Sequence, residues 1–330
     1  MKTRLACVMS LAVALAGCGK QGSEPAVPKA KKPVIAGIVF QDDQFMKLVL
    51  FGMKQAADKA GAEFLQGSTY NKPDKEIELI SAYAARGVDA IMITPISAKA
   101  SVEALKLADR KGIKIVTFNT KADCGAPVAH VECSNEAMGR KTGEAARRYI
   151  ESKLGGKAKI ATLAFKSQLP EQSDGRVLSF KEQIKDLPGV EFVAEQDAWL
   201  TEAAVKKTGD ILTAHPEINV IFSANEGGCL GAALAVKNAG KAGKIGVFGI
   251  GASEQIDSLI LSDDNIMQAV TDASPIETGR LAAELALAAI RGEPVEKFTS
   301  LPGVLVSRED PESVRKFDAE LKNAISSQGK

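Results

Sequence analysis

The 330-residue sequence contains few of the residues on which metal sites and many enzymes depend. It has two histidines and one tryptophan, and its formal net charge is only +1. The two histidines, His130 and His215, lie far apart in the sequence, and neither belongs to a cluster with metal-ligand spacing. A near-neutral chain also lacks the basic footprint of a nucleic-acid-binding protein. We therefore expect neither a metal site nor a nucleic-acid partner.

The motifs of nucleotide chemistry and of nucleophilic catalysis are missing as well. Gly240-Lys241 is followed by Ala242, without the upstream glycine of a phosphate-binding loop. The glycines of 246–251 stand in the wrong order for a dinucleotide fingerprint, and no Gly-x-Ser-x-Gly elbow occurs. Paired carboxylates can still perform acid–base chemistry, so a hydrolase remains the enzyme alternative. We predict no catalytic residues, no cofactors and a protein that is not an enzyme.

The apolar run near the N-terminus is too short to span a membrane. Residues 5–16 follow Lys2 and Arg4, whereas a membrane-spanning helix needs about 20 apolar residues. A charged start, a short apolar region and small residues before a cut site are typical of a secretory signal. The run ends in Leu-Ala-Gly-Cys at Cys18, which is similar to the bacterial lipobox.

This resemblance implies cleavage before Cys18 and a lipid on its sulfur. We predict a lipoprotein signal peptide over 1–17 and a lipidated tether over 18–32, which is rich in lysine and has no apolar periodicity. The protein would be exported and held on the periplasmic or extracellular side of a membrane by its lipid anchor. The alternative is an ordinary signal peptide with an incidental cysteine.

Three cysteines follow Cys18 in the sequence. Cys124 and Cys133 are close enough to close a small disulfide loop in an oxidising compartment, and buried free thiols are the alternative. Because the number is odd, at least one thiol per chain is left unpaired.

Short apolar runs alternate with amphipathic helical segments from residue 33 onward. We expect strands at 34–40, 63–67, 90–93, 115–119, 159–165, 191–197, 220–224 and 245–250, with helices between them. Such βαβ alternation requires parallel sheets with right-handed crossovers and helices on both faces. Two similar halves suggest two lobes, and ligands of open parallel sheets bind beyond the carboxyl ends of the strands. The sequence therefore predicts a cleft for a small molecule between the lobes.

Several stretches resemble the type I periplasmic binding proteins for sugars, in the ribose- and galactose-binding group. The matching segments, spread over 34–306, are 52–61, 87–95, 112–119, 215–225 and 231–235. The resemblance implies an α/β fold with two Rossmann-like lobes of parallel sheets flanked by helices and joined by a three-stranded hinge. Its N-terminal lobe would comprise 33–132 plus 270–302, and its C-terminal lobe 133–269 plus 303–330.

The same resemblance implies an extracytoplasmic solute-binding lipoprotein of an ABC importer. It would act as a monomer, capture a sugar or polyol between closing lobes and present it to an ABC permease in the inner membrane. The alternative function is a ligand-sensing subunit for a membrane receptor or histidine kinase. Repressors that share this core carry a helix-turn-helix in the place where this chain has a signal and a tether.

The candidate ligand-binding residues stand near strand ends. The family places aromatic rings against the sugar at the positions of Phe45 and Trp199, since the C–H faces of sugars are apolar. The polar candidates, which suit hydroxyl groups, are Asp43, Asn119, Thr120, Asp174, Asn225 and Asp272. A helix cap or a turn is the alternative role for any of the aspartates and asparagines. Asp272 is about one residue out of register with the family's polar position. Asp174 is expected in the loop before a helix over 176–185.

Departures from the family pattern bear on the identity of the solute. The family commonly has Asp-Arg where this chain has Asn119-Thr120, and Phe-Asp where it has Ile250-Gly251. The family also often has an arginine in the segment where Asp174 stands. Both of these arginines are missing from this chain. Arg176 matches a neighbouring structural position, and Glu132, Cys133 and Glu226 are plausible neighbours of the site. An arginine-poor cleft that is rich in acceptors disfavours an acid or a phosphate. It suits a polyol, an unusual sugar, a nucleoside or a solute with an amine.

Overall fold

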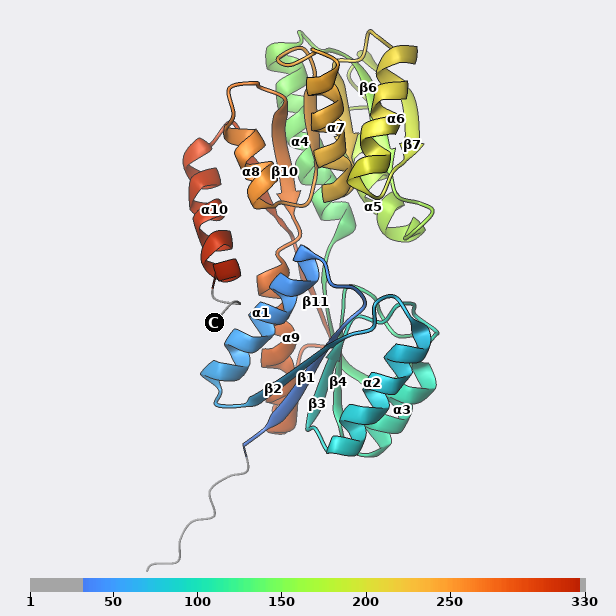
Figure 1. The fold of residues 1–330 in the computed structure, drawn as a ribbon, viewed down its shortest axis with the longest axis vertical. Coiled ribbons are helices and arrows are strands. Elements are labelled where there is room, and N and C mark those ends of the chain that lie inside the picture. Colours follow the sequence, from blue (N-terminus) through green and yellow to red (C-terminus); the bar gives the residue numbers. More distant parts are fainter. Residues whose placement is uncertain (1–31, 327–330) are drawn as a thin grey trace, which may run out of the picture. The chain divides into compact units, whose positions relative to one another are not determined.

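The computed structural model describes residues 32–326 and contains two six-stranded sheets (Figure 1). Across the first sheet the strands are β11 (Phe298–Leu301), β5 (Pro127–Cys133), β4 (Lys114–Phe118), β3 (Ala90–Ile93), β1 (Val34–Val39) and β2 (Glu63–Ser68). Across the second they are β12 (Val304–Ser307), β10 (Met267–Asp272), β9 (Gly246–Ile250), β8 (Val220–Ser223), β6 (Lys157–Ala164) and β7 (Gly189–Asp197). All pairings are parallel except that of β12 with β10.

Helices cover each sheet and bury its apolar side chains. Helices α1 (Gln44–Lys59), α2 (Pro73–Arg86) and α3 (Val102–Arg110) follow strands of the first sheet. Helix α9 (Pro275–Ile290) follows β10 of the second sheet but packs in a cluster of the first. Those of the second half are α4 (Asn135–Lys153), α5 (Pro170–Glu182), α6 (Thr201–Ala214), α7 (Glu226–Asn238), α8 (Glu254–Leu261) and α10 (Pro311–Ser326). Each sheet packs against two separate apolar clusters, as a sheet buried on both faces requires. The predicted α/β fold is confirmed.

The chain passes between the two sheets three times. It leaves the first sheet after Cys133, returns after Asp272, and crosses again between Leu301 and Val304. The resemblance to sugar-binding proteins implies hinge strands near Cys133, Asp272 and Pro302. The predicted lobe boundary at residue 270 is wrong by three residues, because β10 continues to Asp272 in the second sheet.

The third crossing contains Gly303, whose backbone conformation glycine adopts more easily than other residues do. Gly303 has a φ of 68°, and a Cβ at this position would lie 2.8 Å from the carbonyl oxygen of Asp272. The Lys141 Nζ donates to the Gly303 carbonyl oxygen at 2.8 Å, and the Ser134 N–H donates to the Leu301 carbonyl oxygen at 2.9 Å. These bonds tie the first and third crossings together.

The predicted signal peptide, the Cys18 lipid and nearly all of the predicted tether fall outside the described residues. Within 32–326, no helix is both long enough and apolar enough to cross a membrane.

The three cysteines of the described part are free thiols. Cys124 packs against a cluster of the first sheet, whereas Cys133 is buried in a cluster of the second. The disulfide that the spacing permits is therefore not formed in this structure, and the alternative of free thiols holds. Burial raises the pKa of Cys133 and of Cys229 to about 12, so both thiols stay protonated at neutral pH.

Candidate ligand-binding site

A cavity of about 560 Å³ is lined by residues that follow strands of both sheets. Strands β1 and β4 of the first sheet and β7, β8, β9 and β10 of the second end beside it. The carboxyl ends of parallel strands are where α/β folds bind ligands, and this volume is typical of small-molecule sites.

The first sheet contributes Asp43, Phe45 and Asn119. Asp43 caps helix α1 by accepting a hydrogen bond from the Met46 N–H at 2.8 Å. Two residues later, Phe45 packs against apolar clusters of both sheets, so its ring bridges the two halves of the chain. Asn119 directly follows β4 with a φ of 55°, a left-handed conformation that asparagine tolerates better than most residues.

The second sheet contributes Trp199 and Asn225. Trp199 lies two residues after β7 and packs edge-on against the buried Phe165, with ring centroids 5.1 Å apart. Asn225 caps α7 by accepting from the Gly228 N–H at 3.3 Å, and its Nδ2 donates to the Trp199 carbonyl oxygen at 2.7 Å. Both ends of the Asn225 amide are thus occupied, so this residue combines the two roles that the sequence leaves open. It lines the cavity and it holds the Trp199 loop.

Arg176 also lines the cavity, although its position in the sequence suggests a purely structural role. Its Nε donates to Asn135 Oδ1 at 2.8 Å, and its Nη1 donates to the Ala224 carbonyl oxygen at 2.9 Å. Neither partner is charged, and burial lowers the pKa of Arg176 to about 10, so the guanidinium remains protonated at neutral pH. Among the described side chains around the cavity, Arg176 is the single base.

Helix α5, which carries Arg176, begins six residues earlier than the sequence predicts. The motif Ser173-Asp174-Gly175 is typical of a turn, yet α5 runs through it from Pro170. A Cβ on Gly175 would lie 3.1 Å from the Asn135 Cβ, so glycine allows α5 to pack against the first turn of α4. A tertiary contact thus overrides the local turn signal.

This shift removes Asp174 from the site. The prediction that Asp174 lies in a loop is wrong, since it lies within α5, and it forms an ion pair with Lys166 at 3.1 Å. Thr120 is also absent from the residues that line the cavity, as is Glu132, which hydrogen-bonds to His130 Nε2. Cys133 and Glu226, which the sequence suggests only as neighbours, do line it.

The second crossing brings Asp272 to the cavity. Asp272 is 6% exposed and accepts a hydrogen bond from the Ser274 N–H at 2.7 Å. Burial raises its pKa to about 6, and backbone N–H groups oppose this rise. Asp272 therefore supports the hinge segment at the same time as it faces the site.

The structure brings six of the eight predicted ligand-binding residues to one cavity. These are Asp43, Phe45, Asn119, Trp199, Asn225 and Asp272. Sequence reasoning missed other polar side chains around it, namely Gln41, Gln44, Asn135 and Gln172. The signal for them was present but weak, because each stands near a helix N-terminus that follows a strand end, where the carboxyl edge of a parallel sheet places its loops.

The comparisons with known proteins agree with this geometry. A family model described as a periplasmic binding protein domain matches residues 37–294. The chain is 27% identical over 258 residues to the ABC transporter periplasmic-binding protein YphF of Escherichia coli, covering 76% of this chain and 78% of the relative. It is 28% identical over 271 residues to the ribose import binding protein RbsB of Haemophilus influenzae, covering 81% of this chain and 88% of the relative.

Solved structures of similar fold hold small polyhydroxylated ligands. An ABC transporter periplasmic solute-binding protein from Actinobacillus succinogenes with bound D-allose matches with a TM-score of 0.78 and 26% identity, covering 86% of this chain and 100% of that one. A solute-binding protein from Bacillus halodurans with bound myo-inositol has a TM-score of 0.76 at 22% identity, covering 89% and 99%. The second likeness shows the fold alone.

Proposed function

Because this chain belongs to the periplasmic binding protein domain family, we propose that it is the exported solute receptor of an ABC importer. In this role it captures a sugar or a sugar-like polyhydroxylated molecule in the cavity between its two halves and delivers it to a membrane permease. D-allose and ribose appear among the ligands of its relatives, which supports the class of solute.

The observation that carries the proposal is the composition of the cavity wall. Rings from both halves, Phe45 and Trp199, line it together with amides and carboxylates at strand ends. Flat apolar rings suit the C–H faces of a sugar, while Asn119, Gln172 and Arg176 offer hydrogen bonds to its hydroxyls. A receptor of this kind closes around its ligand by hinge rotation, and the three crossings are the segments that would bend.

Thermal unfolding against a library of sugars, polyols, nucleosides and amines tests the proposal. A solute that binds only the folded state raises its stability by about 2.7 kcal/mol at one hundred times its dissociation constant. We expect one polyhydroxylated solute, or a few related ones, to raise the unfolding temperature. Absence of any shift, in protein that mass spectrometry shows to carry no co-purified solute, would contradict the proposal.

Trp199→Ala is the variant that locates binding in the cavity. Loss of the ring should weaken binding of the solute by at least about five-fold, because a stacked aromatic contact contributes on the order of 1 kcal/mol or more. Tyr70→Ala is the matched control, since Tyr70 is 62% exposed and does not line the cavity. Asn225→Ala is a poorer test because it also removes the cap of α7, which costs about 1 kcal/mol of stability.

We further propose that the protein binds its solute without transforming it. The test is recovery of the solute after prolonged incubation with the protein and its analysis by mass spectrometry. Unchanged solute supports a receptor, and a hydrolysed product would favour the hydrolase alternative.

A further inference from the structure

The cavity wall carries a surplus of negative charge. Its charged side chains are four carboxylates, those of Asp42, Asp43, Glu226 and Asp272, and one guanidinium. The guanidinium of Arg176 binds an amide oxygen and a backbone carbonyl oxygen and forms no ion pair with any described carboxylate, so it neutralises none of the four directly. Within residues 32–326, Asp42 is the one of the four that forms an ion pair with a base, Lys47, at 3.5 Å.

Two of the remaining carboxylates come to the cavity from opposite halves of the chain. Asp43 is the cap of α1, beside the first sheet, and Glu226 is the first residue of α7, beside the second. Glu226 is half-buried, and its side chain bonds with Ser253. Burial raises the pKa of Glu226, and the nearby charge of Asp43 raises it further. Asp43 and Glu226 both line the cavity, so their like charges face the same space.

A cation placed between them would relieve this repulsion. A protonated amine donates up to three hydrogen bonds to carboxylate oxygens, and such charge-assisted bonds are stronger than those of a neutral hydroxyl. The rings of Phe45 and Trp199 line the same cavity, and aromatic faces also attract cations. The second terminal nitrogen of Arg176 has no hydrogen-bond partner among residues 32–326, so it is suited to a hydroxyl or carbonyl oxygen at the other end of the solute.

We propose that the preferred solute is polyhydroxylated and carries a protonated amine, which binds between Glu226 and Asp43. This inference rests on the proposed receptor function and narrows its solute class to amino sugars and amino polyols. A neutral sugar makes the same kinds of hydroxyl contact but leaves the acidic surplus uncompensated.

Calorimetric titration with matched pairs of solutes tests the inference. The pairs are D-glucosamine with D-glucose, and 1-amino-1-deoxy-D-sorbitol with D-sorbitol, at pH 7.5. We expect the amino member of at least one pair to bind ten-fold or more tightly than its neutral partner. Raising the salt concentration should weaken that preference, because salt screens the attraction of the amine to the carboxylates.

Glu226→Gln should reduce the preference for the amino member by ten-fold or more while keeping the shape of the side chain. Glu202→Gln is the matched control, because Glu202 also lies in the first turn of a helix of the same half but is exposed and outside the cavity wall. An unchanged preference in Glu226→Gln would overturn the assignment. If that variant fails to fold, the comparison of solute pairs on the unmodified protein still decides the solute class.

The failure of this inference can be told apart from failure of the proposed function. If only the neutral members bind, or if both members of each pair bind with equal affinity, the preference for an amine is refuted and the proposed receptor function is retained. If no amino member, no neutral member and no solute of the library binds, both the amine inference and the proposed receptor function are refuted.

Discussion

Asp257 on helix α8 has a carboxyl group that is buried near other carboxyl groups. Its exposed fraction is 0%, and neither of its carboxylate oxygens has a hydrogen-bond partner among residues 32–326. Burial raises its pKa to about 7, and the negative charges of Asp318 and Asp272 raise it as well. Asp257 therefore holds a proton in the folded protein under conditions in which it would lose that proton in the unfolded chain.

The sign of the resulting pH dependence follows from proton uptake. Between about pH 4, where an unfolded aspartate titrates, and about pH 7, the folded state binds more protons than the unfolded state. This carboxylate thus lowers the free energy of unfolding as the pH rises through that window. Asp257→Asn removes the ionisable group and should raise stability at pH 8 by on the order of 2 kcal/mol.

Urea unfolding at pH 5 and pH 8 measures this effect. The stability difference between variant and parent should be larger at pH 8 than at pH 5. Asp210→Asn is the control, because Asp210 is exposed on α6 and pairs with Lys206. The same difference at both pH values would show that Asp257 is not protonated in the folded state.

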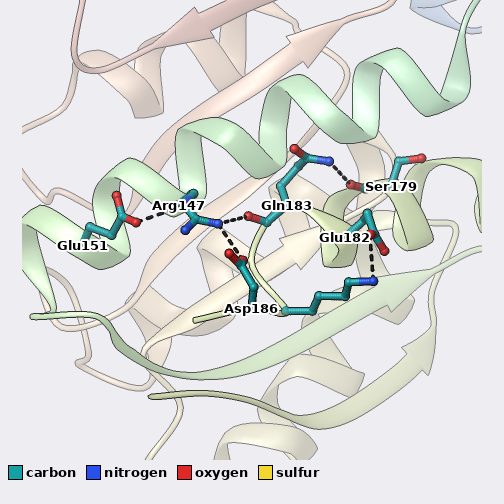
Figure 2. Close-up of polar contacts among 7 residues, drawn as sticks. Arg147, Glu151, Ser179, Glu182, Gln183 and Asp186 are labelled. Carbon is teal, nitrogen blue, oxygen red and sulfur yellow. Dashed lines mark hydrogen bonds and ion pairs between the residues drawn. The ribbon is translucent and has the colours of Figure 1, made fainter. Parts of the chain in front are cut away.

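At the scale of elements, helix α5 is fixed by its close packing against α4. A Cβ on Gly139 would lie 2.2 Å from the carbonyl oxygen of Arg176, so the two backbones touch where α5 carries its site residue. At the far end of α5, the Arg147 Nη1 donates to the Gln183 carbonyl oxygen at 2.9 Å and to Asp186 at 2.6 Å (Figure 2). The position of Arg176 in the cavity thus depends on contacts that α4 provides.

Gly139→Ala should disturb both stability and binding. The added methyl group forces α5 away from α4, which we expect to cost about 1–3 kcal/mol of stability and to weaken solute binding through the displaced Arg176. Gly209→Ala is the control in a helix where a Cβ meets nothing within 4 Å, and it should gain about 0.5–1 kcal/mol. Unfolding curves and titrations of both variants measure these effects, and unaltered binding in stable Gly139→Ala would refute the link to the site.

The contrast between predicted and observed elements has a physical cause. Helix ends with local signals were predictable, as at Gly87, whose φ of 73° closes α2 in the left-handed conformation. The start of α5 has a local signal in Pro170, which suits a first helical turn, but the turn-forming residues Ser173-Asp174-Gly175 follow it and oppose that signal. Four strands were missed. Strands β11 and β12 have four residues each and are partly exposed, which leaves little apolar pattern. Strands β5 and β10 are largely buried, but polar residues such as His130 and Gln268 interrupt their apolar pattern.

In the site as well, residues with a local sequence signal were predictable, and residues placed by contacts between distant segments were not. Strand-end residues such as Asn119 and Trp199 could be placed from the strand pattern together with the family resemblance, whereas Arg176 reaches the cavity through the packing of a helix. The sequence alone does not encode that packing in any short-range motif.

At the scale of the whole molecule, the exported and lipid-anchored state of the chain remains a prediction from Cys18 and the residues before it. In a bacterial host, metabolic labelling with a radioactive fatty acid should mark the protein. Cys18→Ser should abolish the label and release the protein from membranes, because the acyl chains supply the membrane affinity. Cys7→Ser is the control, and a label that persists in Cys18→Ser would contradict the lipid site.

The two halves of the described chain meet at the cavity, so a bound solute contacts both of them. Phe45 contacts the cores of both halves, and two of the three crossings reach the same space at Cys133 and Asp272. Residues widely separated in the sequence thus act on a single solute, which couples binding to the relative position of the halves.

Fluorescence titration of the sole tryptophan tests whether the solute binds in this cavity. Trp199 is the only tryptophan in the sequence and it lines the cavity, so its emission reports on that space alone. The solute that stabilises the protein should change this emission saturably, with the same dissociation constant that calorimetry gives. A solute that binds tightly and leaves the emission of Trp199 unchanged would place the binding site outside this cavity.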